Sequence, residues 1–375
     1  MFYDDDLTKI IDQYVAPAAR EVDANGEFPQ ASIDALQSAG LLGITVSEEF
    51  GGGGLGLAAA SDIVRRLSMA CGSTAMVACM HYAAVAALAA TGHAEVLREI
   101  GAGAHLTTLA FSEVGSRSHF WAPLSTARAD GDVVVLDARK SWVTSAREAD
   151  SYVWSSLPLS AAGPMSLWLV RAGIEGLTYP ARFDGLGLRG NDSCPLSADG
   201  VRVPATALLG ADGAGLDLAL SVVLPWFLLL NASASVGLMQ AVTTEAIKHL
   251  TGTRLQHLDQ SLAQQLPARI KLATMQIQTD RTRTLVADAV AAVEQGRPDA
   301  QLLVLEVKPA ADESAALVAD LAMTVCGGAA FRKELGIERR FRDSRAARVM
   351  APTTDALLDF VGRALCGLPL MDGPA

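Results

Sequence analysis

Charged side chains are scarce in this chain of 375 residues, where Asp, Glu, Lys and Arg make up 19% of the sequence. The charges are also unevenly spread, since none occurs from Leu67 to Ala94 or from Leu218 to Thr244. Runs of this length raise the question of a membrane span. Small and polar residues interrupt both runs, so we expect two helices buried in a helical core and no membrane span.

Basic residues are fewer than acidic ones, 30 against 41, and the net charge is −11. A nucleic-acid binder needs a basic surface, so this class is excluded. The first residues, MFYDDDLTK, are acidic and lack the apolar stretch of a signal peptide. We therefore expect a cytoplasmic protein.

Cysteine is rare, and its pattern excludes two kinds of site. The five cysteines are Cys71, Cys79, Cys194, Cys326 and Cys366. Their number is odd, no CxxC pair occurs, and no histidine lies at ligand spacing from a cysteine pair. Neither a metal site nor a disulfide framework is expected, which fits a reducing compartment.

Several common catalytic motifs are missing as well. The GxSxG, HExxH and P-loop patterns do not occur. The glycine run from Gly51 to Gly56 satisfies GxGxxG, but it lacks a preceding strand and an acidic residue about 20 positions later, so we interpret it as a turn. His81, His93 and His105 are interpreted as packed or surface residues rather than catalytic bases.

The chain divides into three parts by its local patterns. Residues 1–105 show apolar residues at helical spacing, and residues 213–375 are again helical, with Gly296-Arg297-Pro298 as a break. Residues 106–212 contain short β-rich segments separated by Gly, Pro and Asp, namely VVVLD, SWVT, SYVW, SLWLV and VRVP. Helices, then strands, then helices predict an α+β protein and not a doubly wound sheet.

Five short motifs, in order along the chain, carry a resemblance. They are AGLLGI with SEEFGG (residues 39–44 and 47–52), FSEVGSRSH (111–119), KSWVTS (140–145), GLRGNDS with VRVP (187–193 and 201–204), and CGG with ERRFRD (326–328 and 338–343). Together they resemble the acyl-CoA dehydrogenase superfamily over nearly the whole chain. The resemblance implies an N-terminal helical domain, a middle β-barrel-like domain and a C-terminal four-helix bundle.

The resemblance also implies FAD as the cofactor. The positions that match the family's FAD contacts are Leu109, Ser112, Ser118, Trp142, Thr144, Arg254, Gly327, Gly328 and Thr353. Arg254 and the two glycines match groups that reach FAD from a neighbouring subunit, so a homodimer or homotetramer is implied. An electron-transfer flavoprotein or a flavin reductase is the implied electron partner.

The chain departs from the family at the catalytic base. Family dehydrogenases remove the α-proton of an acyl thioester with a glutamate, because this proton is weakly acidic. Ala351 stands at the usual position of that glutamate and Phe227 at the alternative one. Neither side chain can accept a proton. Glu113, His119 and Asp355 are the remaining candidates, although Glu113 matches a common family residue and Asp355 is interpreted as a helix N-terminal charge.

Three functions stay open. The first is α,β-dehydrogenation of an acyl thioester or a related hydrophobic metabolite, with a non-standard base or one supplied by a partner subunit. The second is a flavin-dependent monooxygenase on the same fold, for which no α-proton is removed. The third is a subunit without a base in a hetero-oligomeric dehydrogenase.

Overall fold

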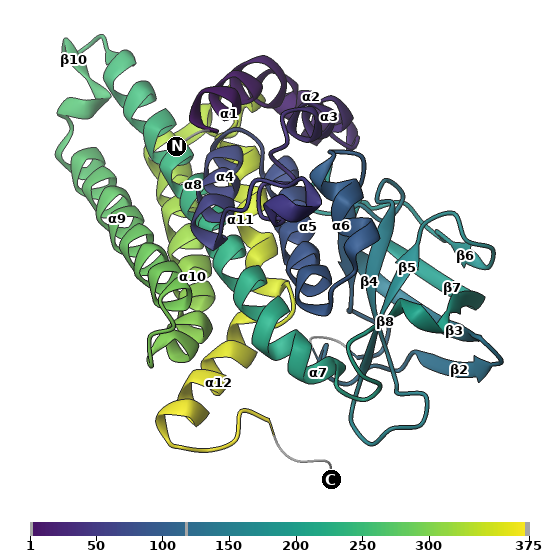
Figure 1. Cartoon of the computed structure of the whole chain (residues 1–375). Coiled ribbons are helices and arrows are strands. Elements are labelled where there is room, and N and C mark those ends of the chain that lie inside the picture. Colours follow the sequence, from purple (N-terminus) through teal and green to yellow (C-terminus); the bar gives the residue numbers. More distant parts are fainter. Residues whose placement is uncertain (1–2, 117–118, 372–375) are drawn as a thin grey trace. The chain divides into compact units, whose positions relative to one another are not determined.

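The computed structural model describes residues 3–116 and 119–371 (Figure 1). The chain forms two compact units. The first comprises Met1–Ala60, Met76–Gly185 and Arg189–Phe227, and the second comprises Ser61–Ala75, Leu186–Leu188 and Leu228–Ala375.

The N-terminal part is helical, as its periodicity predicts. Its helices are α1 (Asp4–Ile10), α2 (Ala16–Asn25), α3 (Gln30–Ser38), α4 (Leu57–Ala70), α5 (Gly72–Thr91) and α6 (Ala94–Gly101). The glycine run between α3 and α4 is a turn, as predicted. Gly51 has a φ of 83°, and a Cβ on Gly52 would lie 2.3 Å from the Val46 carbonyl oxygen, so this close backbone crossing requires glycine.

The strands of the first unit form two four-stranded sheets. In one, the order is β1 (Thr107–Ala110), β4 (Ser151–Ser156), β5 (Ser166–Arg171), β8 (Leu208–Leu209); in the other it is β2 (Thr126–Asp130), β3 (Val133–Val143), β7 (Cys194–Pro204), β6 (Leu177–Thr178). All pairs are antiparallel except β1 with β4. The segments VVVLD and SWVT, expected as separate strands, fall on one long strand, β3, which ends at Val143, one residue before the end of SWVT.

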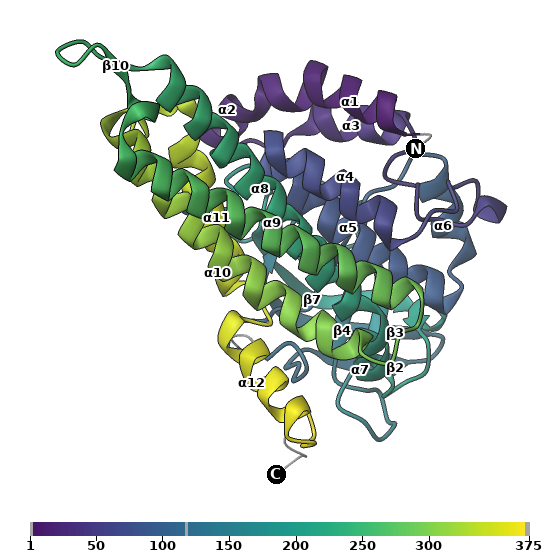
Figure 2. The ribbon, with the colours of Figure 1, turned by 90° about the vertical axis from the view of Figure 1, so that its left-hand side faces the viewer.

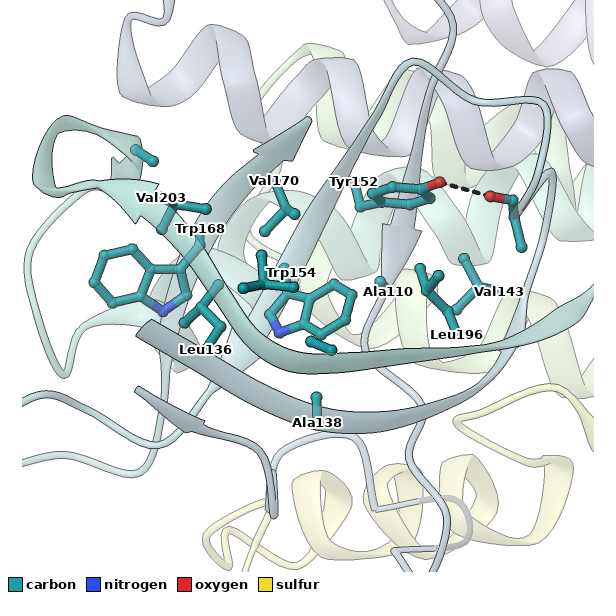
Figure 3. Close-up of a cluster of buried hydrophobic side chains, with 14 of the residues drawn as sticks. Ala110, Leu136, Ala138, Val143, Tyr152, Trp154, Trp168, Val170, Leu196 and Val203 are labelled. Carbon is teal, nitrogen blue, oxygen red and sulfur yellow. Dashed lines mark hydrogen bonds between the residues drawn. The ribbon is translucent and has the colours of Figure 1, made fainter. Parts of the chain in front are cut away.

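Both sheets contribute side chains to one apolar core (Figure 3). Trp154 on β4 and Trp168 on β5 are fully buried in it, opposite Leu136 of β3 and Leu196 of β7. Aromatic side chains of this size bury a large apolar area, which is the main driving force for packing one sheet on the other. The core therefore fixes β3, on which the candidate site depends.

The C-terminal part is helical, with one small hairpin. Its elements are α7 (Gly215–Leu218), α8 (Leu224–Gly252), β9 (Arg254–Leu255), β10 (Gln260–Ser261), α9 (Leu266–Glu294), α10 (Ala300–Cys326), α11 (Ile337–Val349) and α12 (Thr354–Leu365). Figures 1 and 2 show α9 and α10 side by side along their lengths. The break between them falls at residues 296–298, as predicted. The α+β arrangement of helical, sheet and helical parts is thus confirmed.

The two charge-free runs both form helices. Gly72–Thr91 and Gly215–Gly252 are long and apolar enough to cross a membrane, but 72% and 83% of their most apolar windows are buried within the protein. A membrane-spanning helix would present much of that surface to lipid. The burial agrees with the predicted core helices.

Candidate active site

Two predicted FAD-contact segments lie side by side in the first unit. The chain leaving β1 runs along the end of β3, where the Ser141 amide donates to the Ser112 carbonyl over 2.9 Å. The Val114 amide donates to the Arg139 carbonyl over 3.0 Å. The backbone thus places Ser112 next to Trp142, although 29 intervening residues separate them in sequence.

Trp142 is displayed to solvent by an irregularity in β3. Its side chain is 68% exposed, and its φ is 58°, in the left-handed region that a tryptophan rarely adopts. The pairing of β3 with β7 shifts register between Lys140 and Val143, so Trp142 sits in a β-bulge. Bulges of this kind re-aim a side chain, and strained residues concentrate at functional sites.

The other two predicted contacts in this unit are buried. Leu109 on β1 is 7% exposed. Thr144 is 2% exposed, and its Oγ1 lies 3.2 Å from Oγ of Ser193. Ser118 falls outside the described residues, as does its neighbour Arg117.

Glu113, a candidate base, is held in a buried ion pair. Its carboxylate lies 2.5 Å from the Lys140 ammonium and 2.5 Å from the Ser125 hydroxyl, and it accepts the amide of Leu124 over 2.6 Å. Burial opposes its ionisation, but the adjacent Lys140 outweighs this and the pKa of Glu113 is lowered. Burial lowers the pKa of Lys140 to about 8. The pair braces the chain beside the bulge.

The other two candidate bases lie at the surface. His119 is exposed, and its Nδ1 lies 3.1 Å from the Ser116 carbonyl oxygen while its ring meets Trp121 edge-on. Asp355 is exposed in the first turn of α12, where a negative charge favours the helix N-terminus.

The remaining predicted contacts belong to the second unit. Arg254 begins the β9–β10 hairpin and pairs with Asp259 at the surface. Gly327 and Gly328 are exposed after α10, and a Cβ on either would meet nothing within 4 Å. Glycine at these positions leaves room for a closely approaching group. Thr353 is the N-cap of α12, and its hydroxyl accepts the Ala356 amide.

Ala351 and Phe227, the two residues predicted at the family's base positions, both have apolar side chains. Ala351 lies half-buried in the segment between α11 and α12. Phe227 on α8 is 7% exposed. Phe227 belongs to the first unit and Ala351 to the second.

A second buried ion pair was not foreseen from the sequence. Lys308 and Asp312, both fully buried on α10, lie 2.9 Å apart. The available signal was their i, i+4 spacing within an apolar stretch, where a lysine on the buried face of a helix needs a partner.

Comparison with known families decides the classification. The family models for the N-terminal, middle and C-terminal domains of acyl-CoA dehydrogenases match residues 3–101, 108–201 and 213–366. The chain belongs to the acyl-CoA dehydrogenase family. The "Probable acyl-CoA dehydrogenase FadE25" of Mycobacterium tuberculosis (strain ATCC 25618 / H37Rv) is 26% identical over 365 residues, which cover 96% of this chain and 93% of that protein.

Solved structures of the acyl-CoA dehydrogenase fold agree. Butyryl-CoA dehydrogenase from Megasphaera elsdenii superposes with a TM-score of 0.91 at 22% identity, over 96% of this chain and 97% of the other. The prolyl acyl carrier protein oxidase AnaB superposes with a TM-score of 0.88 at 18% identity, over 96% and 98%. The FadE25 and Megasphaera elsdenii relatives are named as acyl-CoA dehydrogenases, which supports a flavin oxidoreductase, and the family generally uses FAD.

Proposed function

We propose that this chain is a FAD-dependent oxidoreductase that removes two hydrogens from the α and β carbons of an acyl thioester. The observation that carries the proposal is the exposed, bulge-held Trp142 beside Ser112, in a chain that matches all three domains of the acyl-CoA dehydrogenase family. FAD would supply the acceptor for the hydride equivalent.

The residues of this chain fit that cofactor. The indole of Trp142 offers an accessible aromatic face beside the end of β3, and the open space at Gly327 and Gly328 admits a polar group close to the backbone. These glycines and Arg254 are proposed to serve the FAD of a second subunit, so a homodimer or homotetramer is part of the proposal. The thioester carrier is proposed to be CoA or an acyl carrier protein. An acyl carrier protein is included because the structural neighbour AnaB is a prolyl acyl carrier protein oxidase.

The α-proton is proposed to leave through a base that does not stand at either family position. Ala351 and Phe227 have no proton acceptor, and Glu113 is committed to Lys140. A partner subunit or an external protein is therefore the proposed source of the base.

The absence of a proton acceptor at Ala351 and Phe227 favours a second candidate function, flavin-dependent monooxygenation of a hydrophobic substrate, because that reaction removes no α-proton. A subunit without its own base is the third.

Anaerobic titration separates these functions. The FAD-loaded protein is mixed with a panel of acyl-CoAs and acyl carrier thioesters, and the flavin absorbance is followed with product analysis. Bleaching with formation of the enoyl thioester is expected for dehydrogenation. No bleaching, with oxygen-dependent hydroxylation once a flavin reductase is added, would replace it by the monooxygenase. Inactivity in both assays would leave the subunit role.

Replacing Trp142 by alanine should weaken FAD binding about tenfold. Loss of stacking on one aromatic ring is worth about 1.5 kcal/mol, which is about a factor of ten in the dissociation constant. Because the side chain is 68% exposed, the free energy of unfolding should change by about 0.5 kcal/mol or less. Flavin fluorescence gives the first quantity and urea unfolding the second.

Tyr14→Ala is the matched control for Trp142→Ala, since Tyr14 is an exposed aromatic residue (43%) in the N-terminal helices, outside the predicted site. Its FAD affinity should equal that of the wild type. Equal affinity of Trp142→Ala and the wild type would contradict the role of the indole.

A further inference from the structure

The ammonium of Lys308 lies at the centre of a buried cluster of oxygen atoms in the second unit. Its Nζ donates to the carbonyl of Ala347 over 2.7 Å and to that of Pro352 over 3.2 Å, and the carbonyl of Met350 is 3.4 Å away. The carboxylate of Asp312 completes the set at 2.9 Å. An ammonium has three donors and no acceptor, so four oxygens converging on it satisfy it fully.

The three carbonyls come from one short stretch of chain. Ala347 lies in the last turn of α11, whose final carbonyls have no partner within the helix. Met350 and Pro352 belong to the segment that joins α11 to α12. A single cation on α10 therefore caps α11 and holds the backbone of the joining segment. A positive charge near the C-terminus of a helix is stabilising.

Two further contacts fasten the same segment. The hydroxyl of Thr354, the first residue of α12, donates to Asp312 over 3.4 Å. From α8, the amide nitrogen of Asn231 lies 3.4 Å from the sulfur of Met350. The segment is thus held from α8 and α10, and its freedom to move is small.

Both charged side chains are closed off from solvent. Lys308 and Asp312 have no exposed side-chain area. Burial lowers the pKa of Lys308 and raises that of Asp312. A group that touched substrate would need an accessible atom, so the pair acts through the segment.

We propose that Lys308 and Asp312 are positioning residues for the segment from Met350 to Thr353. This segment carries Ala351, at the family position of the base, and Thr353, a predicted flavin contact. The significance of the segment rests on the proposed function, whereas its attachment to Lys308 does not. The pair holds the segment at a fixed distance from α10, so that Thr353 meets the cofactor in one geometry.

The test removes both charges together. The double variant Lys308→Met/Asp312→Leu replaces a buried ion pair by apolar side chains of similar size, a change that folded proteins often tolerate. Val318→Ala, a cavity-forming change in the same helix, is the control for a general loss of stability. Amide hydrogen exchange of the peptides covering residues 347–357 and of α9 is measured, together with the dissociation constant for FAD.

In the double variant, exchange of residues 350–356 should be at least tenfold faster while α9 is unchanged, and the dissociation constant for FAD should rise at least tenfold. Val318→Ala should change neither quantity selectively. Exchange within twofold of the wild type would overturn the proposal, and so would faster exchange with unchanged FAD affinity.

If the wild type does not bind FAD, the proposed function is contradicted instead. The hydrogen-exchange result then still tests whether Lys308 and Asp312 hold the segment from Met350 to Thr353. If the double variant does not fold, Thr354→Val removes only the hydroxyl that reaches Asp312. It should speed exchange in the first turn of α12 about threefold, and unchanged exchange would count against the proposal.

Discussion

Replacing Lys140 by methionine should cost the first unit about 3–5 kcal/mol of stability. The change leaves the carboxylate of Glu113 buried without its counter-charge, and breaking a buried ion pair from one side has this magnitude. The Lys140 ammonium also donates to the Ser155 carbonyl over 2.7 Å and to its hydroxyl over 2.9 Å, so these acceptors lose their donor as well. Urea unfolding followed by tryptophan fluorescence measures the loss.

A second substitution should recover most of that stability. In Lys140→Met/Glu113→Gln the buried negative charge is gone, while the amide oxygen can still accept from Leu124 and Ser125. We expect the double variant to lie within about 2 kcal/mol of the wild type. Lys9→Met is the control, because Lys9 pairs with Asp6 at the surface and such pairs contribute about 0.5 kcal/mol. A single variant that costs less than the control would refute a stabilising role for the Lys140 pair.

The same lysine shows how far the sequence could predict the site. In β3 buried and exposed residues alternate from Leu136 to Lys140, and continuing this alternation would bury Trp142 on the same face. The bulge breaks the period and exposes the indole. Register shifts depend on pairing with β7, more than 50 residues away, so no local pattern in the sequence could reveal this one.

The helices and the order of the three parts were predictable because they depend on local periodicity and on breaks such as residues 296–298. The buried pair on α10 was not. An i, i+4 lysine and aspartate usually form an exposed pair on a helix surface. Only the surrounding apolar residues, such as Val304, Val307 and Ala311, indicate that this face turns inward. Which carbonyls meet Lys308 depends on α11, 39 residues further on.

Lowering the pH from 6.5 to 4 should remove about 3 kcal/mol of stability through His81 alone. This histidine on α5 is fully buried, its Nε2 donates to the Leu42 carbonyl over 3.1 Å, and its Nδ1 accepts the Thr107 amide over 3.1 Å. A neutral ring satisfies both contacts, whereas a protonated ring would oppose two donors. Burial, and secondarily the nearby His105, lower the pKa of His81 to about 4.

The direction follows from proton binding. Between pH 4 and the unfolded pKa of about 6.5, the unfolded chain binds a proton at His81 that the folded protein excludes. The free energy of unfolding therefore rises with pH across this window, by about 1.4 kcal/mol per pH unit. Above the window, His81 is neutral in both states and adds no further pH dependence. Urea unfolding at pH 7.5, 5.5 and 4.5 should show a smaller slope for His81→Gln than for the wild type.

Tyr82→Phe provides the matched control, because Tyr82 is the adjacent buried residue and donates to the Leu41 carbonyl over 2.7 Å. Loss of the Tyr82 hydroxyl removes one buried hydrogen bond, worth about 1 kcal/mol, but adds no group that titrates between pH 4 and 6.5. The variant should be less stable by the same amount at all three pH values. If the free energy of unfolding of His81→Gln changed with pH as steeply as that of the wild type, the prediction would be wrong. The acid sensitivity would then come from groups other than the ring held between Leu42 and Thr107.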